Sequence, residues 1–336
     1  MGIWKCPVES VGEAMRDYSF YKGKRVFITG HTGFKGSWLC RILLGLGADV
    51  TGYSLEPPTN PNLFNLADIE LSMHSVIGDI RDFKFLKKAF DESQPEIVLH
   101  LAAQPIVRES YIHPAYTYET NVMGTVNILE CIRLSQCVKS FLNVTTDKVY
   151  YNNEWEWGYR ENEPLDGFDP YSNSKSCSEL VTHSYKNSFF NNGQVAISTA
   201  RAGNVIGGGD FANERIIPDC IRAAMKQYND HNYAGWYNVG PDECDCVTTG
   251  DLVDLFCKKW KNNLSWVNQA DKNPPHEANF LKLDCSKIKA KFGWTPCWHI
   301  DEAIANTVAW TKVWLKHGNI PAEMDRQIKE YLGGLE

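Results

Sequence analysis

The chain has 336 residues, 43% of them hydrophobic, and a formal net charge of −7. This length accommodates one large α/β domain with a smaller second lobe, and the acidic balance argues against a nucleic-acid partner. Because we find no apolar run of membrane-spanning length, no signal-peptide pattern and no paired zinc spacing among the 11 scattered cysteines, we expect a cytoplasmic protein with reduced thiols, no membrane association and no metal site.

The predicted elements begin at Lys24, after an N-terminal extension (1–22) without a periodic pattern. Residues 25–29 read as a strand, 30–36 as a glycine-rich turn and 38–46 as an apolar helix. More strands are predicted at 49–53, 96–100, 140–144 and 195–199. Strands alternating with helices indicate an α/β fold with a Rossmann-type doubly wound parallel sheet. We assign residues 23–200 to this domain and 201–336 mainly to a smaller C-terminal α/β lobe.

The turn between the first strand and helix carries the first chemical motif, Gly30-His-Thr-Gly33-Phe-Lys-Gly36. Gly30 permits the tight turn, Gly33 lets a pyrophosphate approach the backbone, and Gly36 lets helix and strand pack closely. The helix N-terminus adds free N–H groups and the positive end of its dipole. The motif therefore predicts a dinucleotide site bordered by His31, Thr32, Phe34 and Lys35, against the alternative of a glycine turn without a ligand.

The choice between NAD and NADP is open at this stage. Tyr53-Ser54-Leu55 ends the second strand, where an acidic residue would mark the ribose of NAD, and no arginine clamp for a 2′-phosphate is evident. Asp79, followed by Ile80, could bind the adenine, or it could cap a helix.

Tyr171 and Lys175 are the candidate reactive pair. Their spacing carries little weight alone, because chance predicts roughly one Tyr-x-x-x-Lys in this composition and Tyr18–Lys22 also matches. The pair, however, opens a helical segment, which places both side chains on one face. The lysine ammonium would stabilise the phenolate and make the tyrosine a usable base near neutrality, and Thr146 could bond the same substrate oxygen.

Several motifs together resemble a known family. The glycine turn, Thr146 with Tyr171 and Lys175, Leu101-Ala-Ala-Gln104 and Thr120-Asn-Val-Met-Gly-Thr125 are similar to the extended short-chain dehydrogenase/reductases. Within that family, the motifs that resemble the CDP-glucose 4,6-dehydratases are Gly30-His-Thr-Gly-Phe-Lys-Gly-Ser-Trp38, Gln104-Pro-Ile-Val-Arg108, Thr146-Asp-Lys148 and Arg201-Ala-Gly-Asn-Val-Ile-Gly-Gly-Gly-Asp210.

The resemblance implies a lyase reaction on a nucleotide-sugar, with NAD regenerated in every cycle. Tyr171 and Thr146 would act on the sugar 4-hydroxyl, Lys148 would remove the C5 proton, and Asp147 would protonate the departing 6-hydroxyl. Leu101, Ala102 and Ala103 would border the cofactor. The alternative for Asp147 and Lys148 is a surface dipeptide at a strand end. The family also implies a homodimer or a dimer of dimers.

The resemblance further implies substrate contacts at Gln104, Arg108, Asn204, Arg215 and His276. Three of them have a structural alternative: a surface ion pair for Arg108, a turn for Asn204 and a capped loop for His276. Gln104 and Arg108 follow the end of a predicted strand, where ligands of open α/β sheets bind.

The chain departs from the family pattern near 223–235. A helix, a strand and an Arg-Pro-Trp-Gln-His segment that family members carry are missing there, and with them an arginine expected to bind the substrate diphosphate. Losing one charge-assisted contact typically costs about 1.5–3 kcal/mol. This shortening keeps two alternatives open: a nucleotide-sugar epimerase or reductase of the same family, or a catalytically impaired paralogue that binds NAD.

Overall fold

The computed structural model describes residues 18–191, 193–210, 218–261, 263–268 and 281–333. Two predicted site residues, Arg215 and His276, lie outside the described residues, as do residues 1–17 of the N-terminal extension.

A single seven-stranded sheet forms the centre of the molecule, and every strand pairing in it is parallel. The order β3-β2-β1-β4-β5-β6-β7 reverses direction between β1 and β4, which confirms the predicted doubly wound Rossmann-type sheet. The strands are β1 Arg25–Thr29, β2 Asp49–Ser54, β3 His74–Ile77, β4 Ile97–His100, β5 Ser140–Val144, β6 Ala196–Ala202 and β7 Trp236–Val239.

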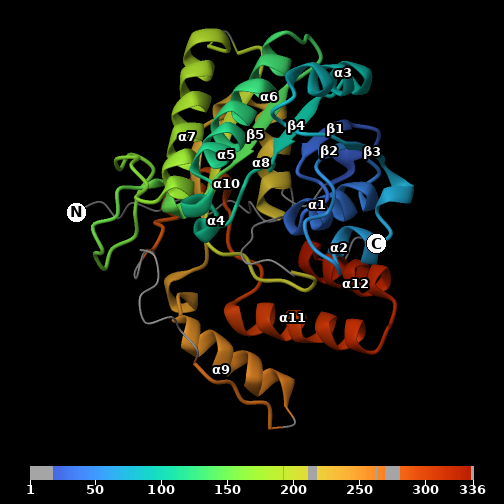
Figure 1. Ribbon diagram of the computed structural model, residues 1–336, viewed down its shortest axis with the longest axis vertical. Helices are drawn as coiled ribbons and strands as arrows, with labels where there is room; N and C mark the ends of the chain where they lie inside the picture. Colours follow the sequence, from blue (N-terminus) through green and yellow to red (C-terminus); the bar gives the residue numbers. More distant parts are fainter. Residues whose placement is uncertain (1–17, 192, 211–217, 262, 269–280, 334–336) are drawn as a thin grey trace, which may run out of the picture.

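Helices cover both faces of the sheet and continue into a separate C-terminal group (Figure 1). The α-helices are α1 Phe34–Gly45, α2 Leu63–Leu66, α3 Phe83–Ser93, α4 Val107–Ile112, α5 Pro114–Tyr118, α6 Gly124–Arg133, α7 Pro170–Phe189, α8 Pro218–Asn229, α9 Thr249–Trp260, α10 Ser286–Phe292, α11 Ile300–Leu315 and α12 Ile320–Leu332. Short 3₁₀ or π turns lie at η1 Tyr18–Tyr21, η2 Glu70–Ser72, η3 Glu119–Met123, η4 Asp147–Val149, η5 His231–Tyr233 and η6 Glu243–Asp245. Across the described part of the chain, none of the helices is both long and apolar enough to traverse a bilayer.

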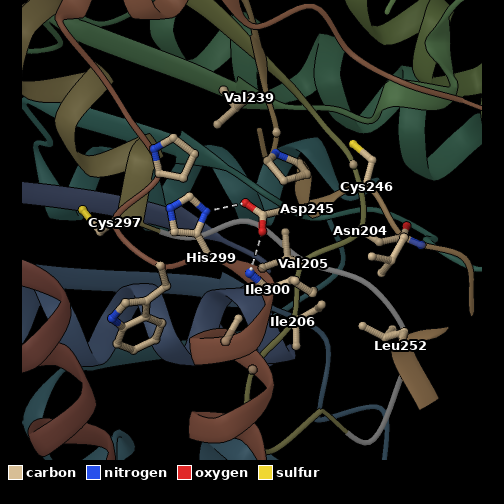
Figure 2. A pocket seen from close by; sticks show the side chains of 18 of the residues that line it. Asn204, Val205, Ile206, Val239, Asp245, Cys246, Leu252, Cys297, His299 and Ile300 are labelled. Atoms are coloured by element: carbon tan, nitrogen blue, oxygen red, sulfur yellow. Dashed lines mark hydrogen bonds and ion pairs between the residues drawn. The ribbon is translucent and has the colours of Figure 1, made fainter. Parts of the chain in front are cut away.

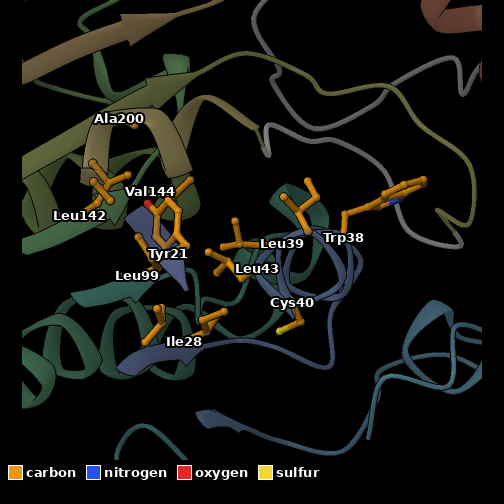
Figure 3. Packing of buried hydrophobic residues seen from close by; sticks show 14 of the residues in the cluster. Tyr21, Ile28, Trp38, Leu39, Cys40, Leu43, Leu99, Leu142, Val144 and Ala200 are labelled. Atoms are coloured by element: carbon orange, nitrogen blue, oxygen red, sulfur yellow. The ribbon is translucent and has the colours of Figure 1, made fainter. Parts of the chain in front are cut away.

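The period-2 geometry of the strands divides the core into two layers. Ile28, Leu99 and Leu142 point to one face and pack with α1 (Figure 3), whereas Phe27 and Phe141 point to the other and pack with α3, α6 and α7. Both faces of the sheet are therefore covered by helices and shielded from water, which explains the nearly continuous apolar sequences of the central strands.

The main core begins a few residues before Lys24. Tyr18 and Tyr21 of η1 are buried within the first core layer. Phe20 meets Tyr228 of α8 edge to face, with ring centroids 5.1 Å apart, and Lys24 Nζ donates to the Tyr228 hydroxyl at 3.2 Å. The end of the N-terminal extension therefore docks on a helix that lies some two hundred positions later in the sequence.

The chain after β6 contributes both to the sheet and to the lobe. α8 packs on β4, β5 and β6, and only η5 separates it from β7, which pairs with β6. α9 and α11 then pack together below the sheet in the view of Figure 1, while α12 returns to contact α1. In the described residues this lobe is built from helices, with one isolated bridge between Tyr159 and Leu283.

Candidate active site

The glycine turn connects β1 to α1 at the point where the strand order reverses. Gly30 has a φ of +81°, and a Cβ there would lie 2.8 Å from the backbone nitrogen of Ala102, at the end of β4. A Cβ on Gly36 would overlap the carbonyl oxygen of Gly30. Both positions therefore require glycine, the first for its backbone conformation and the second for close packing of helix on turn.

Gly33 leaves the first turn of α1 open toward a ligand. It is the N-cap residue of α1, and no side chain caps the helix there. A Cβ on Gly33 would meet only the Gly30 carbonyl oxygen, at 3.4 Å. An uncapped helix N-terminus beside open backbone has the donors and the dipole to hold a pyrophosphate, so these residues fit a dinucleotide.

The side chains of the turn face inward and support its shape. Thr32 Oγ1 lies 2.9 Å from Ser54 Oγ and donates to the Leu55 carbonyl at 2.8 Å, which ties the turn to the end of β2. The His31 imidazole is fully buried, with Nε2 2.7 Å from Ser75 Oγ, and burial lowers its pKa to about 4. His31 is therefore neutral, and only its backbone could touch a cofactor.

Asp79 follows β3 and does not cap a helix. Its carboxylate accepts hydrogen bonds from the Arg81 backbone and guanidinium, and the Arg81 hydrogen bond is the main cause that lowers the pKa of Asp79. The cap of α3 is Asp82, which accepts the Phe85 N–H at 3.1 Å. The alternative of Asp79 as a cap is therefore wrong, and contact of Asp79 and the buried Ile80 with an adenine stays a prediction.

Tyr171 and Lys175 occupy the first two turns of α7, as the sequence predicts. Asp169 caps this helix by accepting the Ser172 N–H at 2.9 Å. Both reactive side chains are buried, at 7% and 5% exposure. Lys175 Nζ donates to the Val144 carbonyl at 3.3 Å, so the lysine is held at the carboxyl end of β5.

The segment that follows β5 brings the remaining reactive residues to the same place. Thr146 is buried, donates to Asp147 Oδ1 at 2.9 Å and accepts the Lys148 N–H at 3.4 Å. A Cβ on Gly203, just after β6, would lie 3.3 Å from Asp147 Oδ2. These residues therefore follow the strand whose last carbonyl binds Lys175, at the carboxyl edge of the sheet where ligands of α/β proteins bind.

Lys175 also connects the reactive helix to the glycine turn. Its pKa is lowered from 10.5 to about 7, chiefly by burial and next by the charge of Lys35, against the opposing effect of Glu179. Lys35 belongs to the first turn of α1. The two motifs, far apart in the sequence, are therefore close enough for their charges to interact.

This pKa makes the folding stability depend on pH. Between about 7 and 10.5 the unfolded chain holds a proton on Lys175 that the folded chain lacks, so the free energy of unfolding rises with pH across that window. We expect this group to contribute roughly 2–3 kcal/mol between pH 7 and 9, since one pKa unit corresponds to about 1.4 kcal/mol. Urea unfolding of the wild type and Lys175→Met at both pH values, without nucleotide, measures the difference. If the free energy of unfolding changed equally with pH in the wild type and in Lys175→Met, the lowered pKa of Lys175 would be contradicted.

A buried ion pair that sequence reasoning missed braces the reactive face. Glu179 lies one helical turn after Lys175, and its carboxylate accepts hydrogen bonds from Thr145 Oγ1 (2.5 Å), Thr199 Oγ1 (2.8 Å) and Arg201 Nη2 (3.0 Å). Arg201 also donates to the Tyr150 hydroxyl at 3.0 Å. The only available sequence signal was Arg201 within its glycine-rich motif, because nothing local pairs it with a glutamate on α7.

Breaking this pair should strongly destabilise the fold. Glu179→Gln leaves the Arg201 cation buried at 4% side-chain exposure without its counter-charge, a change that typically costs 3–5 kcal/mol. Glu130→Gln is the matched control, because its Arg133 partner is 37% exposed and such surface pairs are worth about 0–1 kcal/mol. Denaturant unfolding measures the free energy of unfolding of both variants. Equal losses would show that the buried pair contributes no more to stability than the surface pair.

A cavity of about 460 Å³ opens between the sheet domain and the helical lobe (Figure 2). Asp147 and the predicted substrate residue Asn204 both line it, together with Phe34 and Trp38 of α1. A volume of this size is typical of small-molecule sites. The carboxylate of Asp147 therefore lines the same cavity as side chains of the helical lobe.

The other predicted substrate residues have different surroundings. The Gln104 side-chain amide is committed inside the protein: its oxygen accepts the Ile106 N–H at 2.6 Å, and its nitrogen donates to the Ile106 carbonyl and to Thr117 Oγ1. Arg108 is exposed on α4. The structure brings Asn204 to the cavity and uses Gln104 as an internal brace.

Comparison with protein families and curated proteins gives concordant matches. The family model described as GDP-mannose 4,6 dehydratase matches residues 27–239. A CDP-glucose 4,6-dehydratase from Salmonella typhimurium (strain LT2) is 43% identical over 355 residues, covering 95% of this chain and 99% of the relative. The aligned length exceeds the 336 residues of the chain, so part of the relative has no counterpart here.

Solved structures agree on the fold. A dTDP-glucose 4,6-dehydratase from Streptomyces venezuelae, determined with NAD bound, superposes with a TM-score of 0.72 at 23% identity, covering 88% of this chain and 98% of that one. A UDP-glucose 4-epimerase from Thermotoga maritima, determined with UDP-glucose, gives a TM-score of 0.72 at 21% identity and covers 86% and 99%.

Proposed function

The chain belongs to the GDP-mannose 4,6 dehydratase family, and from that membership we propose that it is an NAD-dependent nucleotide-sugar 4,6-dehydratase acting on CDP-glucose. The product is a CDP-4-keto-6-deoxyglucose, and the enzyme is a hydro-lyase. The observation that supports the proposal is that Thr146 and Asp147 come directly after β5, whose Val144 carbonyl accepts a hydrogen bond from Lys175, one helical turn after Tyr171, within a chain 43% identical to a CDP-glucose 4,6-dehydratase.

Oxidation at C4 is assigned to the α7 pair. Tyr171 takes the proton of the sugar 4-hydroxyl, and Thr146 bonds the same oxygen. Lys175, buried next to Val144, orients the site and stabilises the phenolate when protonated. Glu179 adds a negative charge that favours the protonated lysine.

Elimination is assigned to the pair that follows Thr146. The 4-ketone acidifies the C5 proton, which the neutral amine of Lys148 removes, and the electron pair moves to expel the 6-hydroxyl. Asp147 protonates that hydroxyl, which leaves as water. An epimerase has no departing hydroxyl to protonate, so the Asp-Lys pair favours dehydration over the epimerase or reductase alternative.

The cofactor is assigned to the glycine turn. When bound, a nicotinamide dinucleotide would supply the hydride acceptor for C4 and the hydride donor for C6, and Lys148 would return its proton to C5. The open backbone at Gly33 and the uncapped N-terminus of α1 would hold its pyrophosphate, and the Ala102 backbone closes against Gly30. The structure with NAD from Streptomyces venezuelae supports NAD over NADP.

We further propose a homodimer or a dimer of dimers located in the cytoplasm, with residues 23–200 binding the cofactor and 201–336 forming most of the substrate lobe. Exposed apolar side chains on neighbouring helices support an assembly surface: Phe189 on α7, whose ring contacts Arg133 of α6, and Leu134 at the end of α6. Light scattering coupled to size exclusion tests the assembly.

One assay tests the reaction. Purified protein is incubated with NAD and CDP-glucose, and mass spectrometry follows the loss of one water, with dTDP-glucose and GDP-mannose as comparison substrates. A higher turnover of CDP-glucose than of dTDP-glucose and GDP-mannose would support the assignment. A higher turnover of either comparison substrate would overturn it. NAD binding without any product would instead favour the catalytically impaired paralogue. That alternative is considered because part of the Salmonella relative has no counterpart in this chain.

A further inference from the structure

The rim of the cavity carries a group of metal-ligand side chains that the dehydration reaction does not use. Cys244, Asp245 and His299 each offer one ligand atom, and these atoms all lie within 4.8 Å of one another. Cys244 and Asp245 belong to η6, which follows β7, whereas His299 immediately precedes α11. The group therefore joins two segments that are remote in sequence.

The histidine and the carboxylate already hold a fixed arrangement. Asp245 is buried, and its Oδ2 lies 2.7 Å from His299 Nδ1 while Oδ1 accepts the Ile300 N–H at 3.1 Å (Figure 2). Figure 2 shows this pair against the cavity, with both side chains among its lining. This contact holds the imidazole and the carboxylate next to each other, so two of the three ligand side chains are already in place.

The electrostatic surroundings favour a divalent cation. The η6 turn carries Asp242, Glu243 and Asp245 in four consecutive positions. Lys289 and Lys282 pair with Asp242 and Glu243, respectively, whereas the carboxylate of Asp245 faces the histidine. Once Zn²⁺ displaces the proton of the Cys244 thiol, the sulfur and the Asp245 carboxylate supply two negative charges that neutralise the divalent ion.

We propose that Cys244, Asp245 and His299 form a zinc site that fastens the η6 turn to the N-terminus of α11. One sulfur, one nitrogen and one oxygen ligand suit tetrahedral Zn²⁺, with water in the fourth position. Tetrahedral zinc places such ligand atoms about 3.5 Å apart. The ligand atoms lie within 4.8 Å of one another and Cys244 is exposed, so zinc binding requires a rearrangement on the order of 1 Å. Binding of Zn²⁺ displaces the proton shared by His299 and Asp245, together with the thiol proton.

The site's test is independent of the CDP-glucose assignment. The full chain, purified without a histidine tag and stripped with a chelator, is titrated with Zn²⁺ alone and followed by calorimetry and elemental analysis. We expect one zinc per chain and a rise in melting temperature with zinc concentration. Cys244→Ser and His299→Gln should each weaken binding by about tenfold or more, whereas Cys257→Ser on α9, outside the group, should not change it.

Cobalt substitution identifies the ligands. Co²⁺ bound to the wild type should show a sulfur-to-metal charge-transfer band that is lost in Cys244→Ser, and circular dichroism verifies that each variant keeps its fold. Absence of stoichiometric zinc, zinc binding unchanged by both variants, or binding of Cu²⁺ but not Zn²⁺ would each overturn the proposal.

Discussion

Lys148→Ala is expected to leave the first oxidation intact and to slow loss of water by about 10²–10⁴-fold, the usual contribution of a general base. The reason is that the proton of the 4-hydroxyl is assigned to Tyr171, on α7, whereas the C5 proton is assigned to Lys148, in η4. Single-turnover experiments with CDP-glucose should therefore show reduced nicotinamide absorbance that forms at the normal rate and persists.

Solvent exchange separates Lys148 from its neighbour. In deuterated water, Lys148→Ala should not exchange the C5 hydrogen of the bound sugar. Asp147→Asn, which retains the base but lacks the acid for the 6-hydroxyl, should exchange it while still failing to eliminate water. Lys88→Ala, a 70% exposed lysine on α3, is the control and should behave as wild type. Full turnover by Lys148→Ala would refute the assigned role.

Tyr171→Phe is expected to abolish the first step itself, lowering kcat by about 10²–10⁴-fold with no reduced nicotinamide formed. The hydroxyl is the only atom group removed from a side chain that is 7% exposed, so packing should be nearly unchanged. Stopped-flow absorbance with CDP-glucose and NAD provides the measurement.

Tyr185→Phe on the same helix is the matched control for Tyr171. Its hydroxyl donates to Glu130 Oε1 at 2.9 Å, about four helical turns after Tyr171 and therefore about 20 Å further along α7. Its kcat should stay within about twofold of wild type, because the hydroxyl is too far from Tyr171 to reach the same substrate atoms. A similar loss of kcat in both variants would indicate that any tyrosine substitution on α7 impairs the enzyme, and that Tyr171 has no specific role.

The sequence predicted the elements whose patterns are locally complete. β1 and β5 have the predicted bounds, because their apolar residues are buried on both faces and end at glycine or polar residues. β3 was not predicted: His74–Ile77 is a half-exposed edge strand with a weak apolar pattern. The pairing of Tyr171 with Lys175 was predictable because helical periodicity alone places them on one face.

Contacts between distant segments could not be predicted in this way. Gln104 follows a strand end and looks like a ligand in sequence, but its amide is used within the protein by Ile106 and Thr117. Glu179 and Arg201 form a buried pair only because α7 crosses β6. Such partners depend on how the helices pack against the sheet. Residue types and their spacing in the sequence do not determine that packing.

The docking of η1 on α8 has a consequence for biosynthesis. Tyr18 and Tyr21 are buried in the core layer that α8 completes, and Phe20 meets Tyr228. While the chain is being synthesised, the apolar surface of β4, β5 and β6 that α8 covers stays exposed until residues around Tyr228 have left the ribosome. Such long-range closure slows folding and prolongs exposure of aggregation-prone surface. Nascent chains that end before α8 should therefore be ready clients for chaperones, whereas chains that extend past β7 should not.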